Sequence, residues 1–129
     1  GREFPRFSAI KTFFRLPIAD INDDFNDDYN VALFGIPYDG GVSYRPGARF
    51  APTLVREVSS LGRGFHMTRA LSVFEKIKAA DVGDCSVVPI DQAQTYEKIE
   101  NFVTHLVNKN KKFISVGGDH STTLPVLRA

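Results

Sequence analysis

The sequence has 129 residues, of which 43% are hydrophobic and 24% charged, values typical of a globular chain rather than a fibrous or disordered one. The 16 Lys and Arg residues nearly balance the 15 Asp and Glu residues, and a formal charge of +1 argues against binding to nucleic acid or an anionic membrane. This length can bury one core but not two, so we expect a single domain or a piece of one.

Residues 1–30 are predicted to form a surface arm followed by a loop. Residues 20–28 are rich in Asp and Asn, which favour turns. A calcium-binding loop that starts at Asp20 is excluded, because Phe25 occupies the position that needs Gly and Val31 the position that needs Glu. We therefore interpret this run as a solvated charged loop.

The first strand is predicted at residues 31–36, a continuous apolar run of the kind that parallel sheets bury on both faces. A loop rich in Gly and Pro follows at residues 37–50. Pro52 can begin a helix that ends near Gly62. The apolar positions of this helix are Val55, Val58 and Leu61. Residues 64–78 do not indicate one element clearly.

The second strand is predicted at residues 77–82, and Asp91 can cap the helix that follows it. Apolar residues recur along that helix at spacings of three and four, which indicates one buried stripe: Tyr96, Ile99, Phe102, Val103, Leu106 and Val107. Lysines complement the C-terminal helix dipole before a third strand at residues 113–116. The alternation of strands and helices predicts an α/β fold with a parallel sheet covered on both faces.

Ligands of open parallel sheets gather beyond the carboxyl ends of the strands, which selects the loops that begin at Gly35, Asp81 and Gly117. The last of these loops places His120 after two glycines, where a neutral imidazole can ligate a metal or act as a base. Asp119 can accept a hydrogen bond from an imidazole N–H. Ser121 or Thr122 can cap the next helix. From this loop alone, a histidine that only caps the turn is an equally good interpretation.

Other residues offer weaker candidate sites. Asp81 and Asp84 bracket a glycine at a strand end, which suits contact with a metal ligand, approach of a metal, or a simple turn, and the turn is favoured. His105 falls on the striped helix, where a structural role is expected. His66 lies in the segment without a clear element and keeps a smaller chance of reaching a site. Cys85 has no evident means of lowering its thiol pKa and is interpreted as structural.

The sequence lacks the motifs of serine hydrolases and of nucleotide-binding proteins. No G-x-S-x-G elbow, P-loop or G-x-G-x-x-G motif follows a predicted strand.

A single cysteine suits a reducing compartment, so we expect a cytoplasmic protein, with an organellar location as the alternative. No apolar run approaches the roughly 20 residues that cross a bilayer, and a secretory signal pattern is missing. The chain starts at Gly1 and its one methionine is Met67, so we expect a processed or excised segment.

Three stretches together resemble the ureohydrolase family, the agmatinase and arginase group. They are Gly35-Ile36-Pro37-Tyr38-Asp39 with Ser43-Tyr44-Arg45-Pro46-Gly47-Ala48-Arg49-Phe50, then Asp81-Val82-Gly83-Asp84, then Gly117-Gly118-Asp119-His120-Ser121. The Arg-Pro-Gly-Ala-Arg-Phe loop looks closer to the agmatinase-like branch. The resemblance makes residues 1–129 the N-terminal part of a single ureohydrolase domain, with 1–30 as arm and acidic loop and 31–129 as the start of the α/β core.

The resemblance implies a three-layer α/β/α fold of the arginase and deacetylase type, incomplete in this chain, and a homo-oligomer, trimer or hexamer, at full length. It implies hydrolysis of a small guanidino compound such as agmatine to urea and an amine. Two Mn²⁺ ions per full-length subunit would lower the pKa of a bridging water, and Ni²⁺ is a possible substitute. The family's metal-binding histidine corresponds to His120, and Asp119 would then support that ligand.

The remaining metal ligands and the catalytic residues are expected beyond Ala129, since the family's Asp-Ala-His-x-Asp and Ser-x-Asp-x-Asp motifs do not occur in the chain. The isolated segment is therefore expected to have little or no activity and to aggregate through an open sheet edge. Guanidinobutyrate, guanidinopropionate and guanidine remain alternative substrates. A non-catalytic truncated relative that acts as an interaction or regulatory module is the alternative function, and a metal-free small-ligand domain is a third.

Overall fold

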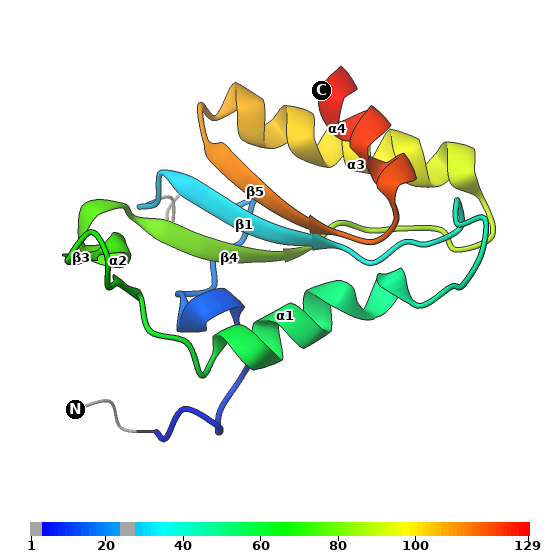
Figure 1. The fold of residues 1–129 in the computed structure, drawn as a ribbon. Coiled ribbons are helices and arrows are strands. Elements are labelled where there is room, and N and C mark those ends of the chain that lie inside the picture. The colour runs from blue at the N-terminus through cyan, green and yellow to red at the C-terminus, as the bar shows by residue number, and fades with distance from the viewer. Residues whose placement is uncertain (1–3, 24–27) are drawn as a thin grey trace.

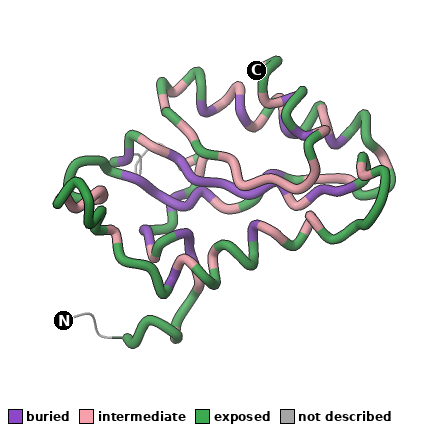
Figure 2. The backbone as a smooth tube through the Cα atoms, in the orientation of Figure 1, coloured by how far each residue is buried: buried purple, intermediate pink, exposed green. Residues whose placement is uncertain are grey.

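The central sheet consists of three parallel strands, β1 (Val31–Ile36), β4 (Ala79–Asp84) and β5 (Lys112–Gly117), in the order β4-β1-β5. The computed structural model describes residues 4–23 and 28–129, so Phe25 of the acidic run lies outside the described residues. The apolar run of β1 occupies the middle of the sheet and is buried from Ala32 to Ile36, as Figure 2 shows. A strand flanked on both sides has no edge to expose, which suits an uninterrupted apolar sequence.

Helices cover both faces of this sheet, which gives three layers (Figure 1). Helix α1 (Ala51–Ser59) lies on one face, and α3 (Gln92–Asn108) and α4 (Thr123–Arg128) lie on the other. The predicted three-layer α/β fold is confirmed. None of the helices in the described ranges has both the length and the apolar character needed to cross a membrane.

Short elements complete the chain. They are η1 (Phe13–Arg15), η3 (Ala48–Phe50), β2 (Phe65–His66), β3 (Leu71–Ser72), α2 (Val73–Lys76) and η4 (His120–Thr122). Strands β2 and β3 pair in antiparallel fashion and, with α2, occupy the segment that the sequence left without a clear element. A two-residue strand is too short to produce a recognisable alternation of apolar and polar residues.

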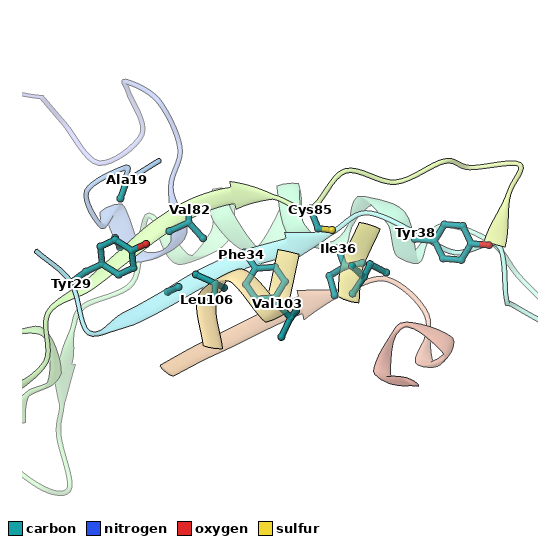
Figure 3. Close-up of a cluster of buried hydrophobic side chains, with 12 residues drawn as sticks. Ala19, Tyr29, Phe34, Ile36, Tyr38, Val82, Cys85, Val103 and Leu106 are labelled. Carbon is teal, nitrogen blue, oxygen red and sulfur yellow. The ribbon is translucent and has the colours of Figure 1, made fainter. Parts of the chain in front are cut away.

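The stripe of α3 forms the main core with β1. Asp91 caps the helix as predicted, because its carboxylate accepts a hydrogen bond from the Gln94 amide at 2.9 Å. Ile99, Val103 and Leu106 are fully buried. Figure 3 shows Val103 and Leu106 beside Phe34 of β1. The predicted stripe is correct in its centre, whereas Val107 at its margin is 44% exposed.

Helix α1 turns its predicted apolar positions outward. Val55, Val58 and Leu61 are exposed, and Leu61 lies beyond the end of the helix. Pro52 and Ser60 are buried instead, and the Arg56 side chain between them is only 12% exposed. The inward side of α1 is therefore the side that carries an arginine, for which the end of β4 supplies two carboxylates.

Part of the predicted surface arm packs against the sheet. Phe13 is fully buried, and Leu16 and Ala19 are nearly so. Ile18 forms an isolated parallel bridge with Asp81, and the Asp81 amide donates to the Pro17 carbonyl at 2.9 Å. The arm thus covers the outer edge of β4, which the sequence did not predict because the contact joins residues more than 60 positions apart.

Strand β4 is shifted two residues along the chain from the strand predicted at 77–82, because it begins at Ala79 and runs through Asp84. The turn favoured at Asp81 and Asp84 is therefore wrong. Gly83 has a φ of +83°, and the pairing of β1 with β4 shifts between Leu33 and Gly35. A bulge at Gly83 explains the glycine without ending the strand.

Candidate functional site

The loops that follow β1, β4 and β5 meet at the carboxyl end of the sheet, at the side where α1 begins (Figure 1). The chain turns there from β5 into η4, whose first residue is His120. The first and last of the three predicted loops are in direct contact, because the Asp119 amide donates to the Tyr38 carbonyl at 2.9 Å.

His120 is exposed and borders an open pocket of about 420 Å³. Ser115 and Gly117 of β5 and Thr123 of α4 also line this pocket. The Nδ1 atom of His120 lies 3.4 Å from the Thr123 hydroxyl oxygen. An accessible imidazole at a strand end can accept a metal ion or a proton, as the sequence predicted for this position.

Asp119 uses its carboxylate for the backbone around it. Its Oδ1 accepts from the Ser121 amide at 2.8 Å and from the Ser121 hydroxyl at 2.5 Å, and its Oδ2 accepts from the Gly41 amide at 2.8 Å. Asp119 is thus the cap of η4. Thr122 occupies the N-cap position of α4, as one of the two predicted residues, but its side chain makes no capping hydrogen bond there. His120 and Asp119 are both described, and no hydrogen bond joins their side chains. Support of the imidazole by Asp119 therefore stays a prediction.

A second carboxylate orders the far end of the 37–50 loop. Asp39 is 2% exposed and accepts from the Gly47 amide at 2.6 Å and from Arg49 Nε at 2.6 Å. The hydrogen bond from Arg49 lowers the pKa of Asp39 to about 2, although burial opposes this shift. Asp39 therefore stays charged over the physiological range and holds the loop closed.

Asp81 and Asp84 both form ion pairs with Arg56. Arg56 donates to Asp81 from Nε at 2.8 Å and Nη2 at 2.9 Å, and to Asp84 from Nη1 at 2.6 Å. Its guanidinium carbon also lies 4.2 Å from the centre of the Phe13 ring. Burial alone would lower the pKa of Arg56, but the hydrogen bonds with both carboxylates raise it. In this arrangement the two carboxylates are engaged by a cation, which gives them a structural role.

The remaining candidates lie away from His120. His66 sits in the β2–β3 hairpin at the opposite end of the sheet, where its Nδ1 accepts from the Arg69 amide at 3.3 Å (Figure 1). His105 on α3 has its Nε2 at 2.8 Å from the Ile21 carbonyl, which ties the acidic loop to the helix. Cys85 is buried, and desolvation raises the pKa of its thiol to about 12, as expected for an unreactive cysteine.

The described residues do not complete a metal site. No group of three or more His, Cys, Asp or Glu side chains that could hold a metal ion occurs within residues 4–23 and 28–129. His120 fits one ligand position, because it is exposed beside an open pocket. One imidazole does not hold an ion alone, so any metal here needs further ligands.

Sequence reasoning missed three residues of this region, namely Gly41, Arg49 and Arg56. Gly41 and Arg49 lie within the Gly- and Pro-rich loop at residues 37–50, but Gly41 falls between the motif stretches and the partners of both residues are set by the fold. Arg56 lies between apolar positions of a helix, which gives no sign that it faces inward. The signal that could have led to these residues is the position of the motif loops at the ends of predicted strands.

Comparisons with known proteins agree on one family. Residues 29–129 match the model of the family described as the arginase family. Proclavaminate amidinohydrolase of Streptomyces clavuligerus is 40% identical over 125 residues, and guanidinopropionase of Pseudomonas aeruginosa is 40% identical over 129 residues. These alignments cover 97% and 98% of this chain, but the chain spans only 39% of the length of either relative.

The structural likeness extends over the same part of the molecule. The solved structure of the S. clavuligerus proclavaminate amidinohydrolase matches with a TM-score of 0.87 and 38% identity. The match covers 97% of this chain and 40% of that protein. Both the sequence and the backbone therefore match about two fifths of a longer relative.

Proposed function

This chain belongs to the arginase family, and on that premise we propose that it is the N-terminal part of a metal-dependent hydrolase that converts a guanidino compound to urea and an amine. The observation that carries the proposal is the exposed His120 at the carboxyl end of β5, on a chain 40% identical to an amidinohydrolase. The family that the three motif stretches predicted is correct.

We assign His120 the role of a metal ligand through an imidazole nitrogen. A pair of divalent ions, Mn²⁺ in the first instance and Ni²⁺ as the alternative, would lower the pKa of a bound water so that hydroxide forms near neutral pH. The chain's own contribution is to hold the imidazole at the strand end. The other ligands and the catalytic residues are assigned to the part of the protein beyond Ala129.

The substrate is a small guanidino compound such as agmatine. The two relatives are named for proclavaminate and guanidinopropionate, so the group attached to the guanidinium varies among similar proteins. Guanidinobutyrate, guanidinopropionate and guanidine therefore stay open. We further propose a cytoplasmic protein that assembles as a trimer or hexamer at full length.

The alternative is a non-catalytic interaction module. The outward face of α1 favours it, because Phe50, Leu54 and Val58 are each more than half exposed at spacings of four residues. The two functions place different demands on the rest of the natural protein. An enzyme requires further metal ligands from other segments, whereas a module requires only a partner for the exposed surfaces.

The deciding experiment measures the natural gene product. We expect an intact mass of more than twice that of this segment, about two Mn²⁺ or Ni²⁺ ions per chain, and urea release from a guanidino substrate. His120→Ala should lower metal content and reduce urea release by at least about tenfold, while His66→Ala should change neither. A natural product with the mass of this segment and no bound metal would refute the enzyme and favour the module.

A further inference from the structure

The loops after β1 and β5 touch through their backbones. Gly118 has no room for a side chain, because a Cβ there would lie 1.6 Å from the Tyr38 carbonyl oxygen. A Cβ on Gly41 would lie 2.6 Å from the Ser121 hydroxyl oxygen and 3.2 Å from Asp119 Oδ2. The two loops can approach this closely only with glycine at both positions.

One carboxylate spans this contact. Asp119 Oδ1 holds Ser121 in the turn, and Oδ2 holds the Gly41 amide of the neighbouring loop. His120 stands between Asp119 and Ser121, so both of its chain neighbours are fixed by the same side chain. The turn also contains the adjacent Gly117 and Gly118, whose backbones are intrinsically the least restrained. The carboxylate adds to the hydrogen bond from the Asp119 amide to the Tyr38 carbonyl, and it is the side chain that joins both neighbours of His120 to the turn and to the other loop.

The neighbouring loop is itself a firm anchor. Tyr38 is buried, and Asp39 closes the other end of the loop through Gly47 and Arg49. A tie from Asp119 to Gly41 therefore fastens the turn to a segment that is held at both ends.

We propose that Asp119 is a positioning residue that sets the place of His120 by tying its turn to the 37–50 loop through Gly41. The inference rests on the proposed function, in which His120 is a metal ligand. It differs from the sequence-based expectation, because Asp119 acts here through backbone amides and not through the imidazole N–H.

The test uses the full-length natural protein and three variants. Asp119→Asn keeps the size of the side chain but leaves one acceptor oxygen for donors on two loops. Gly41→Ala pushes the same contact apart from the other side without altering the carboxylate. Asp91→Asn is the matched control, because Asp91 also caps a helix with its carboxylate, accepting from the Gln94 amide, but belongs to α3 rather than to this contact.

Two readouts are required. Hydrogen exchange of peptides that cover residues 37–47, measured without metal, reports whether the loop is tied. Equilibrium dialysis against Mn²⁺ reports how well His120 is positioned. We expect Asp119→Asn and Gly41→Ala each to speed loop exchange roughly tenfold and to weaken Mn²⁺ binding by at least about tenfold. The double variant should be no worse than the worse single variant, because both remove one contact. Asp91→Asn should change neither readout.

Three results would overturn the proposal. They are unchanged loop exchange in Asp119→Asn, faster exchange with unchanged Mn²⁺ affinity, and weaker Mn²⁺ binding in Asp119→Asn but not in Gly41→Ala. The last result would indicate that the carboxylate acts on the imidazole directly. A wild-type protein that neither binds Mn²⁺ nor releases urea would refute the proposed function, and with it the metal part of this inference. Loop exchange would still show whether Asp119 ties the loops.

Discussion

Arg56 joins three separate parts of the chain, namely α1, the end of β4 and the arm. Asp81, which is 2% exposed, accepts from Arg56 and also from the Phe13 amide at 2.9 Å. Removal of the cation would leave a buried carboxylate with only amide donors. Breaking a buried pair on one side is far more costly than losing an exposed one.

Arg56→Met should therefore lower the free energy of unfolding by about 3 kcal/mol or more. Chemical denaturation of the natural protein measures this change. Arg63→Met, at an exposed position after α1, is the control and should cost less than about 0.5 kcal/mol. Equal losses in the two variants would show that the network contributes no more than a surface charge.

The lowered pKa of Asp39 predicts that the stability of the fold depends on pH. Its folded pKa of about 2 lies below the ordinary value of 3.8, so its contribution to stability is complete above 3.8 and is lost as pH falls toward 2. The thermal midpoints of wild type and Asp39→Asn should therefore differ clearly at about pH 6, and the difference should shrink below about pH 4 and vanish as pH falls through about 2. A difference that stays constant across this range would contradict the assigned shift.

At the scale of single residues, the sequence located His120 but not the partners of the charged side chains. Two glycines after an apolar run are a local signal, and they identified the turn. Asp119 meets Gly41 across 78 positions and Arg56 meets Asp81 across 25, and local patterns do not encode such distances. The motif resemblance directed attention to the loops without revealing these contacts.

The two long helices illustrate when periodicity is sufficient. The stripe of α3 was predictable because an apolar spacing of three and four has one obvious partner, an apolar strand. In α1 the same spacing gave the wrong side. An arginine that faces the core is stable only where carboxylates neutralise it. Those carboxylates, Asp81 and Asp84, had been predicted to form a turn, so the inward side of α1 was not recognised.

The margin of the α3 stripe can be tested directly. Leu106 is fully buried, whereas Val107 is 44% exposed although the pattern included both. Leu106→Ala should cost about 2–5 kcal/mol of unfolding free energy, and Val107→Ala less than about 1 kcal/mol. Similar costs would mean that Val107 is covered in the natural protein and that the stripe is wider than in this segment.

At the scale of the molecule, the two edges of the sheet differ. Residues 17–19 cover β4, whereas among the described residues β5 pairs only with β1. Ile114 of β5 is 55% exposed. An uncovered edge with an apolar side chain favours pairing with other chains.

The 129-residue segment alone should therefore associate as its concentration rises and should release no urea. Light scattering coupled to size-exclusion chromatography measures the association. Ile114→Lys should reduce it, since a charge on an edge strand opposes pairing. Ile90→Lys is the comparison, because Ile90 is 98% exposed but lies outside the strands of the sheet. A segment that stays monomeric at every concentration would refute this prediction.

The asymmetry of the edges also gives the sheet a direction of growth. Among the described residues the arm already bonds to β4, so the edge of β5 is the one open to a further strand, from the same chain or another. That strand would end or begin next to the turn of His120. The side chains of that strand would thus lie beside His120, which has no second metal ligand near it among the described residues. The same strand would complete both the sheet and the metal site.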